Sequence, residues 1–355
     1  MKQIKDLSWN IGDLKIKLPI VQGGMGIGVS SAGLAAAVSN EGGVGTISAV
    51  GLKYLSDDKK MTSATALQNE IAKARALAPE GVLAVNIMFA LTEFEPIVEA
   101  AMDAGADIIF AGAGLPLDLP KMRKEDTKTK LVPIVSSAKA ARIIAKWWTE
   151  KYNYVPDAFI VEGPMAGGHL GFKLNEIDDP RFCLENLITE TVEVVKELEQ
   201  KHNKIIPVIA AGGVFTGADI NKFLSLGATA VQMGTRFVAT EECDASPKFK
   251  QSYINCKKED IVIMVSPVGM PGRSIKNEFI DKVEQGLMKP QVCSFHCIKT
   301  CKKKEAPYCI SKALLNAYKG NLSDGFTFVG ANGYRINEII SVKTLINQLI
   351  TEMCL

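Results

Sequence analysis

Short apolar runs recur along the first part of the chain, and each is followed by small residues and then by a longer amphipathic stretch. Near-continuous apolar runs are typical of parallel strands that are buried on both faces. The eight runs span residues 18–24, 43–48, 82–89, 106–114, 131–137, 157–163, 206–213 and 228–235.

Helical patterns separate most of these runs. They span 30–40, 63–78, 93–105, 136–152, 184–202 and 217–227, whereas the link 115–130 holds only a short helical candidate. Eight strand–helix units in about 240 residues predict an α/β protein built as a (β/α)8 TIM barrel. A doubly wound sheet is the competing architecture, because "GMGIGVSS" partly matches the dinucleotide fingerprint G-x-G-x-x-G but ends on Ser31 instead of glycine.

The alternation of strands and helices is lost after about residue 245. The following segment mixes polar residues with one short strand, and the last stretch has the spacing of an amphipathic helix. We therefore expect a barrel domain over 1–244, a small C-terminal lid or cap domain over 245–335, and a helix within 336–355 that packs back on the barrel.

Composition and charge narrow the function classes. Hydrophobic residues make up 47% of the 355 residues and charged residues 23%, which is typical of a soluble globular protein. Lys and Arg number 41 against 39 Asp and Glu, so no excess of positive charge favours nucleic acid or a membrane surface as a partner. No stretch has the pattern of a signal peptide or a membrane span, and we expect a cytoplasmic protein with reduced thiols.

Polar and glycine residues gather at the ends of the predicted strands, where a barrel of this class carries its chemistry. They are Gln22 to Gly26, Asn86, Gly112 and Gly114, Glu162 and His169, Gly212 and Gly213, and Gln232, Gly234 and Thr235. The turns after the seventh and eighth strands are both rich in glycine, and backbone N–H groups at these two positions commonly bind a phosphate. Ordinary strand-to-helix turns are the alternative, and Thr216 with Asp219 predicts a capping box there.

A phosphate site without a P-loop or a metal-ligand motif points to a phosphorylated cofactor. Pyridoxal phosphate and flavin mononucleotide (FMN) both fit the pattern. The first needs a lysine in the barrel to form an imine, and none of the eight strand runs contains one, so FMN is favoured.

His169 is the candidate catalytic residue. It lies in "EGPMAGGHLG", where glycines leave room for a ring and a ligand, and imidazole can donate or accept a proton near neutral pH. A solvated or structural histidine is the alternative, which suits His202 at a polar helix end better.

Four cysteines, Cys293, Cys297, Cys301 and Cys309, follow the spacing C-x3-C-x3-C-x7-C. Such thiolates could hold an iron–sulfur cluster or, with His296, zinc. The spacing matches neither the usual ferredoxin pattern nor a zinc finger, and buried free thiols on one helical face are the favoured interpretation. We assign no metal ligands.

Several motifs taken together resemble the nitronate monooxygenase (2-nitropropane dioxygenase) family, to which the flavin-dependent enoyl-ACP reductases also belong. The matching stretches are "QGGMG", "VNIM", "EGPMAGGHLG", "IPVIAAGGV" and "LGATAVQMGTRFV", within roughly residues 15–275. The resemblance implies an FMN-containing barrel with a small lid. It implies that His169 is catalytic and that FMN is bound by Gly24, Met25, Asn86, Glu162, Gly167, Gly213, Gln232, Met233, Gly234 and Thr235.

The activity that the resemblance implies is oxidation of an alkyl nitronate by O2 to a carbonyl compound and nitrite. The alternative is an NAD(P)H-dependent enoyl-ACP reductase, because Glu162 stands where many nitronate monooxygenases have glutamine and those reductases often have glutamate. A flavin-binding module that serves a partner is a third hypothesis. We expect a small-molecule substrate, a nitronate or an enoyl thioester, and the interpretation allows a homodimer.

Overall fold

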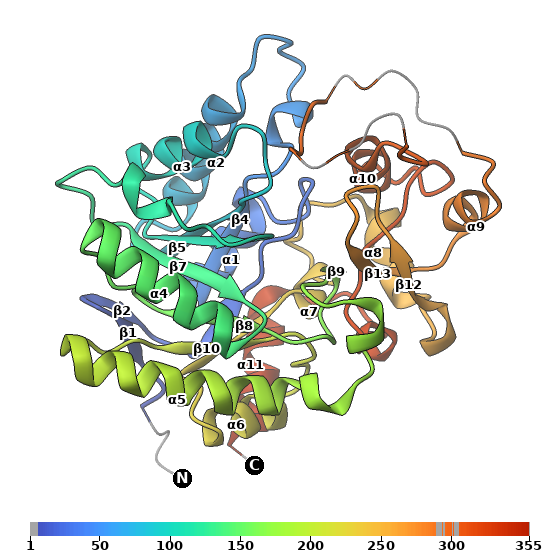
Figure 1. Cartoon of the computed structure of the whole chain (residues 1–355). Coiled ribbons are helices and arrows are strands. Elements are labelled where there is room, and N and C mark those ends of the chain that lie inside the picture. The colour runs from blue at the N-terminus through green and yellow to red at the C-terminus, as the bar shows by residue number, and fades with distance from the viewer. Residues whose placement is uncertain (1–5, 289–292, 294, 300, 302–304, 355) are drawn as a thin grey trace.

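Eight parallel strands close into a barrel in the computed structural model, which describes residues 6–288, 293, 295–299, 301 and 305–354 (Figure 1). The strands are β3 (Ile20–Gln22), β4 (Val44–Ser48), β5 (Val82–Met88), β6 (Ile108–Gly112), β7 (Lys130–Val135), β8 (Phe159–Glu162), β10 (Val208–Ala211) and β11 (Ala230–Met233). Each pairs with its neighbour, and β11 pairs with β3 to close the ring. The predicted TIM barrel is confirmed, and the doubly wound alternative is wrong.

Alternate residues of each strand enter two different cores. In β6, Ile108 and Phe110 pack inside the barrel, whereas Ile109 and Ala111 face the surrounding helices. All four side chains are fully buried. Burial on both faces explains why the strands read as unbroken apolar runs.

The six predicted helices are present on the outside of the barrel. They are α1 (Ala32–Asn40), α2 (Ser63–Leu77), α3 (Phe94–Asp103), α4 (Ala138–Tyr152), α5 (Leu184–His202) and α6 (Gly217–Ser225). The link after β6 forms only a short 3-10 turn, Leu119–Met122, as its sequence predicts. The predicted capping box of Thr216 and Asp219 begins α6.

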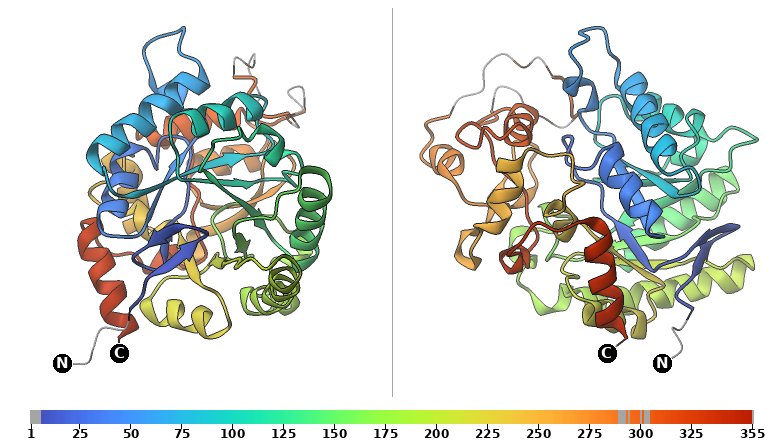
Figure 2. Two further views of the ribbon diagram at one scale, coloured as in Figure 1. Left: turned by 90° about the vertical axis from the view of Figure 1, so that its left-hand side faces the viewer. Right: turned by 180° about the vertical axis from the view of Figure 1, so that it is seen from behind.

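A short hairpin of β1 (Trp9–Ile11) and β2 (Leu14–Ile16) lies across the end of the barrel where the strands begin (Figure 2, left). Its side chains Trp9, Ile11 and Ile16 join the core inside the barrel. The sequence pattern did not predict this hairpin, because strands of three residues are too short to show an alternation.

The segment 245–335, called the lid below, covers the opposite end of the barrel (Figure 1). It contains α8 (Pro247–Ile254), β12 (Ile261–Val265), β13 (Pro271–Ile275), α9 (Glu278–Glu284) and α10 (Ile310–Tyr318). The prediction of one short strand here is wrong, because β12 and β13 form an antiparallel hairpin. β13 also pairs with β9 (Gly168–His169), which lies in the loop after β8, so the lid is joined to the barrel through backbone hydrogen bonds.

Helix α11 (Val342–Met353) packs against α6 and α1 (Figure 2, right). β11 itself is followed only by the four-residue helix α7 (Thr235–Val238). Helix α11 therefore covers the side of the barrel that a longer helix after β11 would cover. In the part of the chain that the structure describes, no helix is both long and apolar enough to cross a membrane.

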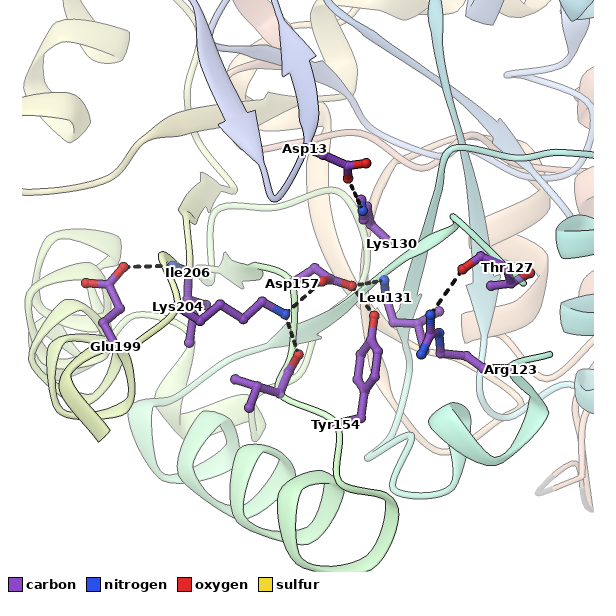
Figure 3. Close-up of polar contacts among 11 residues, drawn as sticks. Asp13, Arg123, Thr127, Lys130, Leu131, Tyr154, Asp157, Glu199, Lys204 and Ile206 are labelled. Carbon is purple, nitrogen blue, oxygen red and sulfur yellow. Dashed lines mark hydrogen bonds and ion pairs between the residues drawn. The ribbon is translucent and has the colours of Figure 1, made fainter. Parts of the chain in front are cut away.

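Asp157 joins three segments next to the start of β8 (Figure 3). Its carboxylate accepts hydrogen bonds from the backbone N–H of Leu131 at 2.8 Å and from the Tyr154 hydroxyl, and it pairs with Lys204 Nζ at 2.8 Å. Lys204 also donates to the Val155 carbonyl at 2.7 Å. Because Asp157 is buried, losing its charge leaves several donors without an anionic acceptor.

We expect Asp157→Asn to lower the free energy of unfolding by about 2 kcal/mol, the range for hydrogen bonds to a buried charged group. Urea unfolding followed by circular dichroism measures this change. The control is Glu197→Gln, which removes an exposed ion pair with Arg142 and should change the stability by less than about 0.5 kcal/mol. Equal effects of the two substitutions would contradict the stabilising role assigned to the buried Asp157 carboxylate.

Candidate active site beneath the lid

A cavity of about 280 Å³ lies where the strands end, between the barrel and the lid. One buried water needs only about 10–15 Å³ of such volume, so the cavity suits a cofactor-sized ligand. Every predicted site residue lines it: His169, Gly24, Met25, Asn86, Glu162, Gly167, Gly213, Gln232, Met233, Gly234 and Thr235. The histidine and the two glycine turns therefore converge on one space.

Three glycine-containing turns, not two, form the end of this cavity where backbone atoms rather than side chains face the ligand space. Gly212 and Gly213 have φ values of 91° and 103°, which L side chains rarely adopt. The third turn comes from the lid: Gly330 N–H donates to Thr235 Oγ1 at 2.9 Å, and Asn332 Nδ2 donates to the Gly213 carbonyl at 2.7 Å. Sequence reasoning missed this turn, although the glycines of "VGANG" were a signal for it.

The polar residues next to the turns leave an acceptor unused. Gln232 is buried, and its Oε1 has no hydrogen-bond partner within the described residues. Gly24 lies so close to Asn86 that a Cβ on Gly24 would come within 2.3 Å of the Asn86 Cβ, so only glycine permits this approach. An unpaired buried acceptor beside bare backbone fits a ligand that presents N–H groups and phosphate, as a flavin nucleotide does.

No lysine or arginine of the described residues lines the cavity. One barrel strand does contain a lysine, because β7 begins at Lys130, one residue before the predicted apolar run. Lys130 lies at the other end of the barrel, where it pairs with Asp13 (Figure 3). A pyridoxal phosphate imine therefore finds no amine among the described residues that line this cavity.

His169 is held by the lid. Its Nε2 lies 2.8 Å from Ser266 Oγ in the turn between β12 and β13, and its ring packs against Phe328 in a T-shaped arrangement with centroids 5.1 Å apart. Arg273 of β13 donates to the carbonyls of Pro164 and Ala166 at 2.5 and 2.7 Å, which fixes the loop before the histidine. None of these lid residues could be identified from the sequence, because each lies far along the chain from the histidine loop.

The pKa values of the two ionisable groups on the barrel side of the cavity shift in opposite directions, and each shift favours the neutral form of its group. Burial lowers the pKa of His169 to about 4 and raises the pKa of Glu162 to about 7. In each case the cause is desolvation, which disfavours the charged form. At neutral pH the imidazole is therefore uncharged, and burial favours the protonated form of the Glu162 carboxyl group.

The partial dinucleotide fingerprint immediately precedes α1, and two carboxylates cap the start of this helix. Asp244 accepts from the N–H groups of Ser31 at 3.0 Å and Leu34 at 3.2 Å, and Glu70 accepts from that of Ala32 at 3.1 Å. These donors are the ones that a dinucleotide phosphate would need. The start of α1 is therefore not a phosphate site.

The cysteine segment forms part of the cavity wall. Thr92 N–H donates to the Cys297 carbonyl at 3.1 Å, and Leu91 bridges to Ile298, whose side chain lines the cavity. The four thiols are half-buried, not buried, and residues 295–297 are not helical, so the predicted helical face is wrong. Residues 294, 300 and 302–304 lie outside the described residues, and among those described no group of Cys, His, Asp and Glu could hold a metal.

Comparison with known proteins identifies relatives along nearly the whole chain. The family model for nitronate monooxygenase matches residues 8–352. The "Probable nitronate monooxygenase" of Staphylococcus saprophyticus is 29% identical over 301 residues, which are 77% of this chain and 80% of that protein.

Solved structures show the same architecture. FabK from Thermotoga maritima superposes with a TM-score of 0.73 at 28% identity, over 96% of this chain and 93% of that one. A nitroalkane oxidase from Streptomyces ansochromogenes has a TM-score of 0.73 at 22% identity, over 96% of both chains. The second likeness concerns the fold alone.

The raised pKa of Glu162 predicts a pH-dependent stability. Between the unfolded-state pKa of 4.5 and the folded-state pKa of about 7, the folded protein binds more protons at Glu162 than the unfolded chain does. The free energy of unfolding therefore falls as pH rises through that window. In cofactor-free protein, Glu162→Gln should therefore be more stabilising at pH 8 than at pH 5, by at most about 3 kcal/mol. Urea unfolding at both pH values measures the difference.

The matched control is Glu190→Gln, which changes an exposed carboxylate on α5 and should show no such difference. A Glu162→Gln variant that changes stability equally at both pH values would contradict the burial of this charge.

Proposed function

The chain belongs to the nitronate monooxygenase family and is an oxidoreductase, and on this premise we propose that it is an FMN-dependent enzyme that oxidises alkyl nitronates with O2. The products would be a carbonyl compound and nitrite. The observation that carries the proposal is the convergence of His169, the glycine turns and the unpaired Gln232 Oε1 on one cavity.

The residues of the cavity suit the parts of FMN. The turns at Gly213 and Gly234, with Thr235, would hold the phosphate through bare N–H and hydroxyl groups. Gln232 Oε1 and Asn86 would hydrogen-bond the polar edge of the ring, against which Gly24 and Met25 would lie. Glu162, Gly167 and Met233 would complete the site. Bound FMN would supply the electron acceptor for the nitronate.

The surroundings of His169 favour a role as hydrogen-bond donor. Val268 N–H donates to Ser266 Oγ at 3.3 Å, and we infer that the serine hydroxyl in turn donates to His169 Nε2. In that arrangement the imidazole proton resides on Nδ1 and would be available to a nitro oxygen. A pKa of about 4 makes the ring a weak base at neutral pH, so the site suits a preformed nitronate better than a neutral nitroalkane that must first lose a proton.

We expect His169→Ala to retain FMN and to lower kcat/KM for a nitronate at least about a hundredfold, because an oriented donor to the developing charge is removed. The absorbance spectrum measures bound flavin, and oxygen consumption measures turnover. The control is His202→Ala at the end of α5, outside the cavity, which should leave both unchanged. An active His169→Ala enzyme would remove the assigned role.

Glu162 favours a second candidate function. The flavin-dependent enoyl-ACP reductases, which the sequence also resembles, often have glutamate at this position, and such an enzyme would reduce an enoyl thioester with NAD(P)H.

Anaerobic reduction of the holoenzyme separates the two activities. Bleaching of the flavin absorbance by a nitronate alone is the result we expect. Rapid bleaching by NADH or NADPH, with none by the nitronate, would replace the first proposal by the second.

A further inference from the structure

The cavity contains no fixed positive charge on any described residue. Its ionisable side chains are Glu162, His169 and Tyr253, and no lysine or arginine reaches it. Burial lowers the pKa of His169 and raises that of Tyr253, so both are uncharged at neutral pH. Among the described residues, therefore, only hydrogen-bond donors can stabilise an anionic group inside the cavity.

The lid side of the cavity is apolar. Its wall consists of Phe249, Ile298, Ile310, Leu314, Phe326 and Phe328. Two residues with hydroxyl groups interrupt this wall, and both have already donated their hydroxyl protons. Ser311 donates to Cys297 Sγ at 3.0 Å, and Tyr253 donates to the Phe328 carbonyl. Asn332 lies outside this wall, in the turn where its Nδ2 donates to the Gly213 carbonyl. The wall therefore presents methyl groups and ring edges, but no free hydroxyl donor.

This apolar wall begins next to the candidate catalytic residue. Phe328 contacts the His169 ring edge to face, and Phe326 contacts Phe328 with centroids 5.0 Å apart. When the nitro group of a substrate lies at His169, the substituent on the reacting carbon has this wall beside it. The hydrogen bonds to the nitro group would thus be made at His169, and the apolar wall extends away from this residue.

We propose that the enzyme is specific for nitronates with an uncharged hydrocarbon substituent and discriminates against nitronates that carry a second anionic group. This inference rests on the proposed nitronate oxidation and names its substrate class. The charge of the nitronate itself would be stabilised by hydrogen bonds at His169. A second anion, only two carbons away, would lie against the apolar wall without a partner.

Burying an unpaired carboxylate is strongly unfavourable, whereas a branched alkyl group of the same shape gains from leaving water. The matched pair of substrates is the nitronate of 3-methyl-1-nitrobutane and that of 3-nitropropanoate, in which a carboxylate replaces an isopropyl group. For the holoenzyme we expect kcat/KM for the alkyl nitronate to exceed that for the carboxylated one at least about a hundredfold. Anaerobic titration of the flavin spectrum should show the same order in Kd.

Substitution of one wall residue should reverse part of this preference. Leu314 lies on α10 in the cavity wall, and Leu314→Lys places a cation there. We expect this variant to raise the kcat/KM of the carboxylated nitronate relative to the alkyl one at least about tenfold. Leu314→Met, which has a similar length and no charge, should keep the original preference.

Leu287→Lys adds the same charge at a side chain that is 67% exposed and outside the cavity, and it should leave the ratio unchanged. Equal kcat/KM values for the two nitronates in the unmodified enzyme would overturn the inference even if Leu314→Lys failed to fold. Absence of turnover with both nitronates would instead refute the proposed function, so the two failures are distinguishable.

Discussion

The parallel pairing of eight strands in a closed ring is the constraint on which the site depends. Because all strands run in the same direction, their carboxyl ends lie on one rim, and residues as distant as Gly24, Asn86, Glu162 and Gln232 face a common cavity. The lid completes this cavity through the backbone pairing of β13 with β9. A loop of glycines would otherwise leave His169 free to move, and the lid instead holds it through Ser266 and Arg273.

The absence of cations from the described cavity determines its electrostatics. Desolvation makes both His169 and Glu162 favour their neutral forms, although one is a base and the other an acid. Such a site stabilises negative charge through oriented donors, as oxyanion sites do, and the same property limits how much charge a ligand can bring. The chemistry and the selectivity that we propose thus have one physical origin.

The sequence was most informative where a residue's neighbours along the chain determine its structure. The barrel strands are long and buried on both faces, the capping box of Thr216 and Asp219 is local, and glycine turns follow β10 and β11 directly. The start of β7 was harder to place, because Lys130 precedes the apolar run from which that strand was predicted. Ser266, Arg273 and Leu314 could not be predicted, because they reach the site only through pairing and packing of the lid, which has no regular period.

The position of α11 has a consequence for how the protein is made. This helix packs between α6 and α1, yet more than 100 residues separate it from β11 in the sequence. During synthesis the side of the barrel that α11 covers stays exposed until the lid has been translated. The nascent chain therefore leaves the ribosome with apolar surface that a molecular chaperone could bind, and final closure of the outer layer occurs late in biogenesis.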